Sequence, residues 1–499
     1  MRRTALLGAL ALAACGPAAP STTPAPARAV VTPDELRRDL AVFASDSFMG
    51  REAGTEGERR AVRFLEARLR QAGLRPAGDS GFVQRVPLVR QRFGRATRFV
   101  VTNRRERQQI PIGEQLVPLA QLGPGAPLPR LEAEGDIVFA GYGLTIPSLE
   151  RDDLAGLDLA GKVVVVVNEV PPDVDAAQRA QLEGQAGLGL RIGTLIPHNP
   201  AAVIVLLRGD FADQFRQALP QLRETVMLAS QAADVPPSAR RAPMILLGVA
   251  REGSLLLPNA WPSNDRPQPL VGRSLRATVE LERTPESAYN VAAVVPGRDA
   301  SLRGSYVAFG SHLDHIGIQS GRADSIANGA DDDASGAVAM LATARAFARA
   351  PVKPRRSLLF VWHTAEEKGL LGSEWFTSHP TVPLDSIVAQ VNADMVGRNG
   401  RDTIHVVGPG TAPDGRSRLL GQVVDSVNAA LPQPFAIART FDTPADPEQL
   451  YYRSDHYNYA KHGVPIVFFT SGLHDDYHEV SDEASRIDYE KLARVSRLF

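Results

Sequence analysis

The 499-residue chain contains a single cysteine, Cys15, so it cannot form an intramolecular disulfide framework. Its charges nearly cancel, with 55 lysines and arginines against 56 aspartates and glutamates. This balance gives no indication of a nucleic-acid-binding surface. Two catalytic signatures are also missing from the sequence. The absence of a G-x-S-x-G elbow argues against a serine hydrolase, and the absence of H-E-x-x-H argues against a zincin-type peptidase.

The cysteine ends a segment that is typical of a bacterial lipoprotein signal. Two arginines precede an apolar run at Ala5–Ala14, which is too short to span a bilayer. The run ends in the lipobox-like tetrapeptide L-A-A-C at 12–15. We therefore expect residues 1–15 to form the lipoprotein signal and acylated Cys15 to anchor the mature protein to a membrane. Because Gly16 follows the cysteine, the expected location is the bacterial cell envelope, at the outer membrane on its periplasmic or surface side. The alternative is an ordinary secretory signal with an incidental cysteine.

Changes in composition divide the rest of the chain into four parts. Residues 16–31 are rich in proline, alanine and threonine, which is typical of a tether. Residues 32–130 are expected to begin a main domain, 131–283 to form a smaller inserted domain, and 284–499 to complete the main domain. The last helical pattern runs to Phe499 without a closing signal, which leaves open where the natural chain ends.

Strand and helix patterns alternate after residue 284. Strands are expected at 291–295, 305–310, 357–362, 387–393, 403–407 and 464–469, and helices at 335–349, 415–430 and 487–498. Such alternation predicts an α/β fold with a largely parallel or mixed sheet sandwiched between helices, and with the inserted smaller domain beside it.

Potential metal ligands collect in the same C-terminal part. Only His198 precedes residue 300, so nine of the ten histidines lie beyond it. Histidines, aspartates and a pair of glutamates follow the expected strands, and the carboxyl ends of parallel strands meet at one edge of a sheet. Imidazole and carboxylate groups suit zinc, and a carboxylate can bridge two ions. Of the adjacent Glu366 and Glu367, one is expected to bind metal and the other to move protons.

Five motifs follow one another in this part of the chain: H-L-D-H at 312–315, G-A-D-D-D-A-S-G at 329–336, the glutamate pair at 366–367, N-A-D-M at 392–395 and Y-H-E-V-S-D at 477–482. Together they resemble peptidase family M28, a family of zinc peptidases whose best-known members are aminopeptidases. The segment S-D-S-F-M-G-R-E-A-G-T at 45–55 is similar to the N-terminal segment of that family. Residues 131–283 resemble the protease-associated domain that some members carry as an insertion.

The resemblance implies an exopeptidase with two zinc ions and a peptide substrate. It implies that Asp332 bridges the ions, and that the remaining ligands are His312 and Asp394 for one ion, and Glu367 and His478 for the other. It also implies a cis peptide bond between Asp332 and Asp333.

The resemblance further implies that Glu366 is the general base and that Tyr477 stabilises the oxyanion. Asp314 matches a carboxylate that orients a metal-bound histidine. Five nearby residues are expected to be structural instead: Asp331 and Asp333 as solvent-facing or loop-fixing groups, and His315, His363 and His456 as polar neighbours of the site.

Three alternatives remain open at this point. The first is a carboxypeptidase or dipeptidase on the same scaffold, which would need a basic group that the sequence does not locate. The second is a glutaminyl cyclase on the related fold, which uses one zinc ion, whereas this chain offers a five-ligand set. The third is a surface receptor or adhesin with a vestigial zinc site.

Overall fold

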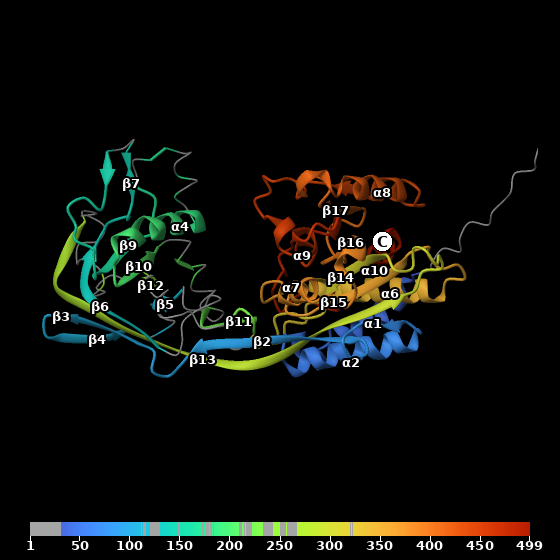
Figure 1. Ribbon diagram of the computed structural model, residues 1–499, viewed down its shortest axis with the longest axis horizontal. Coiled ribbons are helices and arrows are strands. Elements are labelled where there is room, and N and C mark those ends of the chain that lie inside the picture. Colours follow the sequence, from blue (N-terminus) through green and yellow to red (C-terminus); the bar gives the residue numbers. More distant parts are fainter. Residues whose placement is uncertain are drawn as a thin grey trace, which may run out of the picture.

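The computed structural model describes residues 31–499, apart from gaps within 111–129, 148–149, 172–183, 209–221, 233–266 and 320–322. Cys15 and the expected tether lie outside the described residues. Figure 1 shows two lobes side by side, with the long strands β2 (Val83–Phe93) and β13 (Gln268–Val295) running from one into the other. The larger lobe combines the N-terminal helices with the C-terminal part of the chain.

A mixed sheet forms the centre of the larger lobe, as the sequence predicted. Its strand order is β2–β13–β15–β14–β16–β19–β17–β18. The four central strands are mutually parallel: β15 (Ser357–His363), β14 (Tyr306–His312), β16 (Ile387–Ala393) and β19 (Ile466–Thr470). Beyond β19, β17 (Thr403–Val407) runs antiparallel to it, and β18 (Ala436–Ala438) pairs with β17 at the edge of the sheet. The short β1 (Arg75–Pro76) pairs with β13.

Helices cover both faces of this sheet. One face packs against α1 (Pro33–Phe43), α2 (Glu56–Gln71), α6 (Gly336–Arg349), α8 (Arg418–Ala429) and α10 (Tyr489–Leu498), which share one apolar cluster. The opposite face packs against α7 (Leu371–Ser378) and α9 (His456–Lys461). The helices predicted at 335–349, 415–430 and 487–498 correspond to α6, α8 and α10. The sequence did not predict α7 and α9, which are too short to show a clear helical period.

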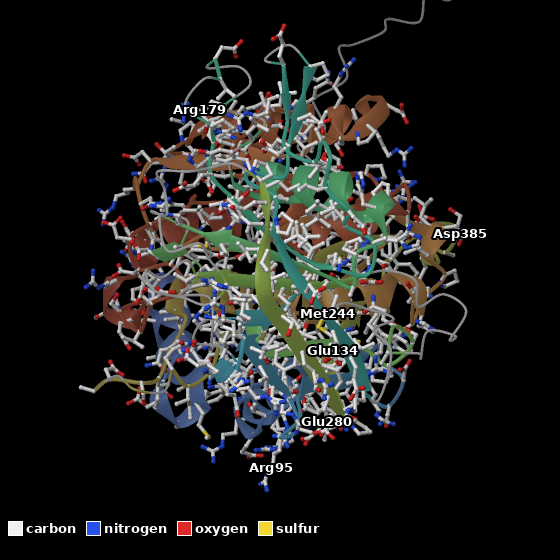
Figure 2. All side chains as sticks on the ribbon, turned by 90° about the vertical axis from the view of Figure 1, so that its left-hand side faces the viewer. Arg95, Glu134, Arg179, Met244, Glu280 and Asp385 are labelled. Carbon is white, nitrogen blue, oxygen red and sulfur yellow. The ribbon has the colours of Figure 1, made fainter. Side chains whose placement is uncertain are left out.

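The smaller lobe contains a second sheet in the order β5–β12–β10–β9–β6–β13–β3–β4. Besides β13, it contains β3 (Arg98–Asn103), β4 (Glu106–Ile110), β5 (Leu116–Pro118), β6 (Arg130–Phe139), β9 (Val163–Val167), β10 (Ala202–Leu207) and β12 (Met244–Val249). The helix α4 (Gly184–Leu195) also belongs to the described part of this lobe. Figure 2 faces this lobe and labels Glu134 on β6 and Glu280 on β13. Because β3–β5 belong to this sheet, the domain boundary predicted at residue 131 falls inside the lobe.

Strand β13 is much longer than the sequence indicated. The predicted strand at 291–295 is only the end of a strand of 28 residues. Its middle carries charged side chains and Pro285, which obscure the strand pattern, but β2 pairs with it from Leu281 to Val291. A third strand, β11 (Glu224–Leu228), pairs with β2 beside this junction. Arg90 of β2 forms ion pairs there with Glu224 and, at 2.6 Å, with Glu286.

Candidate active site

The parallel strands bring the predicted site residues to one edge of the larger sheet. His312 is the last residue of β14, Asp394 directly follows β16, and Glu366 and Glu367 follow β15 within four residues. His478 lies in the loop after β19. Because these four strands run in the same direction, their carboxyl ends meet, and side chains distant in the sequence become neighbours.

One group of potential ligands forms around His312. Its Nε2 lies 3.2 Å from Asp332 Oδ1 and 3.6 Å from Asp394 Oδ1. These three side chains are buried, and their ligand atoms all lie within 4.8 Å of one another. Ser454 donates a hydrogen bond of 2.7 Å to the other oxygen of Asp394. The serine therefore fixes the orientation of this carboxylate.

A second group shares Asp332 from its other side. His478 Nε2 lies 3.2 Å from Asp332 Oδ2 and 3.0 Å from Glu367 Oε2. His315, which the sequence interpretation treated as a structural neighbour, also belongs to this group. Its Nδ1 lies 2.7 Å from Glu367 Oε1 and 3.8 Å from Asp332 Oδ2. The two oxygens of Asp332 thus face different groups, which is the arrangement that a bridging carboxylate needs.

Several ligand atoms have no hydrogen-bond partner among the described residues. They are His312 Nε2, Glu367 Oε1 and both ring nitrogens of His315, all of them buried, and the short contacts among the site atoms lack hydrogen-bond geometry. An unsatisfied buried polar group costs about 1–3 kcal/mol, so such a cluster requires an explanation. Coordination of a metal ion would satisfy these atoms. Buried imidazole nitrogens and carboxylate oxygens in two adjacent groups fit zinc.

The charges of the cluster shift its pKa values in the direction expected of a cation site. Burial lowers the pKa of His312, but Glu366, Asp394 and Asp332 outweigh burial and raise it well above its ordinary value. In the same way Glu367 and Asp332 raise the pKa of His478 to about 10 despite burial. Without metal, the carboxylates therefore attract protons to the neighbouring imidazoles.

The two glutamates of the adjacent pair differ in their electrostatic surroundings. Burial raises the pKa of Glu366 well above its ordinary value, and His312 offsets only part of this shift. Burial and Asp332 also act to raise the pKa of Glu367, but His478 and His315 outweigh them and lower it to about 2. The carboxyl group of Glu367 is therefore the stronger acid and stays ionised, whereas that of Glu366 binds a proton more readily. This contrast suits the division of roles expected from the sequence.

The loop that carries Asp332 is fixed by its neighbours in the sequence. The Asp332–Asp333 peptide bond is cis, as predicted. Asp333 Oδ2 accepts a hydrogen bond from the His312 backbone at 3.1 Å. Asp331 accepts one of 2.6 Å from the Gly397 backbone. Both aspartates are fully buried, so the solvent-facing alternative is wrong and the loop-fixing one holds. Asp482 adds hydrogen bonds from the backbone N–H groups of Asp331 and Asp332.

The remaining predicted neighbours lie around this cluster. His312 Nδ1 is 3.1 Å from the backbone oxygen of Asp314 and 3.9 Å from its carboxylate, so the backbone makes the closer orienting contact. His363 Nε2 contacts the Tyr459 hydroxyl at 3.1 Å, and His456 stacks on Phe468.

A pocket opens onto Asp332, Glu366 and Asp394. Its other lining residues are Met395, Leu450, Arg453, Ser454, Phe468, Thr470, Leu473 and Tyr477. The ring of Tyr477 stacks on that of His478, and its hydroxyl accepts a hydrogen bond of 3.3 Å from Arg453. Burial, together with Asp332 and Glu367, raises the pKa of Tyr477, which keeps its phenol protonated. Sequence reasoning missed Arg453 and Ser454, although both directly precede the Asp455-His456 pair in the chain.

Residues 290–499 match the model of peptidase family M28. Leupeptin-inactivating enzyme 1 of Streptomyces exfoliatus is 31% identical over 199 residues, which are 40% of this chain and 39% of that protein. A probable leucine aminopeptidase of Trichophyton verrucosum is 26% identical over 242 residues, 47% of this chain and 62% of that protein. The chain thus spans only part of the length of these relatives.

Two solved structures resemble nearly the whole chain. An aminopeptidase from Aneurinibacillus sp. strain AM-1 has a TM-score of 0.56 and 18% identity, and the match covers 93% of this chain and 92% of that one. BSAP, a zinc aminopeptidase from Bacillus subtilis, has a TM-score of 0.50 and 16% identity, with coverage of 94% and 93%. At these identities the likeness shows a shared fold.

Proposed function

Because residues 290–499 belong to peptidase family M28, we propose that this protein is a zinc-dependent exopeptidase, an aminopeptidase that removes N-terminal residues from peptides. The observation that carries the proposal is the position of Asp332 between two groups of buried imidazoles and carboxylates. The names of the relatives, leucine aminopeptidase among them, support the same activity.

We assign two zinc ions to the two groups. His312, Asp332 and Asp394 would bind one ion, and Asp332, Glu367 and His478 the other. When bound, a zinc pair of this kind lowers the pKa of a water molecule and polarises a substrate carbonyl.

Two side chains of the pocket would carry the proton transfer and the charge stabilisation. Glu366 has the raised pKa that suits a general base, and it would take a proton from the attacking water and return it to the leaving amine. Tyr477 remains a neutral phenol and would donate its hydrogen bond to the oxyanion. Arg453 contacts the phenol oxygen and orients it.

His315 and His478 compete for the role of imidazole ligand in the second group, and two variants separate them. We expect His478→Ala to lower the affinity for the second zinc ion strongly, because its Nε2 faces both Asp332 and Glu367. His315→Ala should have a smaller effect, roughly 10–100-fold in affinity, if it acts by orienting Glu367. Zinc titration of both purified variants measures this. A larger loss in His315→Ala would exchange the two assignments.

A peptide assay tests the direction of cleavage. We expect the purified protein to release the first residue of an unblocked peptide, and N-acetylation of that peptide to abolish release while C-terminal amidation leaves it intact. Mass spectrometry of the products reads both effects. Release from the acetylated but not from the amidated peptide would contradict an aminopeptidase. Bound zinc without any turnover would favour the receptor or adhesin alternative.

One observation from the structure supports the carboxypeptidase or dipeptidase alternative. Arg453 lines the catalytic pocket, and a guanidinium is the group that binds a terminal carboxylate best. However, Arg453 already contacts Glu448 Oε2 at 3.2 Å and the Tyr477 hydroxyl. We therefore favour its role beside Tyr477, and a comparison of the amidated and unblocked peptides decides between the two.

We further propose that Cys15 anchors the protein in the cell envelope and that the smaller lobe is a protease-associated domain. Among the described residues no helix is both long and apolar enough to cross a membrane. Cys15→Ser should move the protein from the detergent phase to the aqueous phase in detergent partitioning, because the acyl chains provide the attachment. Equal partitioning of the wild type and the variant would show that Cys15 is not an anchor.

A further inference from the structure

Arg51 lies behind the proposed metal centre, in the segment 45–55 near the start of the larger lobe. It ends the short helix η1 (Asp46–Arg51), far from the site in sequence, and its side chain is fully buried. A buried guanidinium normally pairs with a carboxylate. Among the described residues, however, every hydrogen bond of the Arg51 guanidinium goes to a backbone oxygen.

The guanidinium instead donates all its hydrogen bonds to backbone oxygens of the two ligand-bearing loops and of α1. Nε donates to Leu313 at 3.0 Å, between His312 and Asp314. Nη1 donates to Phe43 at 3.1 Å and Asn328 at 2.6 Å, and Nη2 to Gly329 at 2.9 Å and Asp332 at 3.5 Å. One planar group therefore connects the loop after β14 with the loop before α6.

The backbone of the same segment adds further connections to the first loop. Gly317 N–H donates to Gly50 at 3.0 Å, and His315 N–H donates to Arg51 at 3.4 Å. Gly50 has φ +65°, and a Cβ there would lie 2.6 Å from the backbone oxygens of Gly317 and Ala327. Only glycine permits this close approach. The backbone conformation of this segment thus places the Arg51 guanidinium between the two loops.

We propose that Arg51 is a positioning residue of the metal centre, whose guanidinium fork sets the separation between the loop of His312 and the loop of Asp332. The inference rests on the proposed function, since it concerns the same metal centre. Lysine cannot replace Arg51, because an ammonium is a point charge that lacks the planar array of five N–H groups. Lysine could not donate to all the backbone carbonyls that Arg51 contacts, and the remaining carbonyls would be buried without hydrogen-bond partners.

The direction in which zinc affinity changes on substitution of Arg51 distinguishes a positioning role from an effect of its charge alone. The Arg51 charge lies close enough to interact with Asp332, Asp314, Asp333 and Asp482. A positive charge repels an incoming zinc ion, so removing it by Arg51→Met would tighten zinc binding if charge alone mattered. If the guanidinium sets the separation between the two loops, both Arg51→Met and Arg51→Lys weaken zinc binding.

The chain provides a matched control in the smaller lobe. Arg191 is also fully buried, and among the described residues its hydrogen bonds go to the backbone oxygens of Val167, Leu182, Gly187 and Glu169. Burial lowers the pKa of Arg51 and of Arg191 alike, to about 10 in each case. The two arginines therefore share the same chemistry and differ in what they connect.

The test is a zinc titration of metal-stripped protein, combined with thermal unfolding of the stripped and zinc-loaded forms. We expect Arg51→Lys and Arg51→Met to weaken zinc binding about 10–100-fold, the usual loss for residues that orient ligands. Arg191→Lys should lower the unfolding temperature without changing zinc affinity. Unchanged affinity in Arg51→Lys, with equal destabilisation of both forms, or tighter binding in Arg51→Met, would overturn the proposal.

A milder variant covers the case in which the Arg51 variants do not fold. Asn328 Nδ2 donates to Asp46 at 2.8 Å and to Glu483 at 2.9 Å, which holds the carbonyl that Arg51 contacts. Asn328→Ala should weaken zinc binding several-fold, and unchanged affinity would then overturn the inference. If the wild type itself binds no zinc, the proposed function fails. If the wild type binds zinc and all variants bind it equally, only the role of Arg51 fails.

Discussion

Asp332→Asn is expected to abolish peptidase activity and to lower the zinc content of the protein. Both oxygens of Asp332 face potential ligands, Oδ1 towards His312 and Oδ2 towards His478. An amide of the same size has one oxygen and no charge, so it cannot bridge two cations. Metal ions supply several kcal/mol of transition-state stabilisation, which corresponds to a rate loss of roughly 10³-fold or more.

The measurement is the peptide-release rate together with elemental analysis of the purified variant. Asp475→Asn is a suitable control, because Asp475 lies in the loop that carries His478 but outside both ligand groups. It should keep both the rate and the zinc content of the wild type. Full zinc content and a normal rate in Asp332→Asn would contradict a shared carboxylate.

The second large effect concerns the adjacent glutamates. Glu366→Gln keeps the size of the side chain but cannot accept a proton, and general-base catalysis contributes about 10²–10⁴-fold. We expect the rate to fall by at least that factor while the zinc content remains at the wild-type level. Glu367→Gln should instead lose zinc, because a neutral amide replaces the carboxylate next to His478 and Asp332.

Added zinc distinguishes the two variants further. The activity of Glu367→Gln should recover partly in excess zinc, whereas that of Glu366→Gln should not respond. If Glu366→Gln loses zinc and Glu367→Gln retains it, the two roles are assigned the wrong way round. The lowered pKa of Glu367 and the raised pKa of Glu366 agree with Glu367 as the ligand and Glu366 as the base.

The sequence was sufficient to predict where the chemistry gathers, because strand ends are local features. β14, β15 and β16 begin and end within one or two residues of their predicted bounds, and the residues that follow them are adjacent in space. The α/β fold with a central mixed sheet is therefore confirmed. The prediction of the cis peptide bond at Asp332–Asp333 came from the family resemblance and not from a local sequence pattern.

The features that sequence reasoning missed depend on contacts between distant segments. Arg51 donates to backbone oxygens 262 and 277 residues away, and no local pattern indicates such a partner. Strand β13 is stabilised along its charged middle by β2, whose pairing cannot be seen from either segment alone. The sequence predicts only a structural role for His315, and the geometry is needed to place its Nδ1 2.7 Å from Glu367 Oε1.

The central claim is that two metal ions lie on opposite sides of Asp332. Crystals grown with zinc and measured at the zinc absorption edge test it most directly, since each bound ion gives its own anomalous peak. We expect two peaks roughly 3.5–4 Å apart, the usual spacing of two-metal hydrolases. One should lie beside His312 and Asp394, and the other beside Glu367 and His478. A single peak, or peaks that do not contact Asp332, would contradict the account.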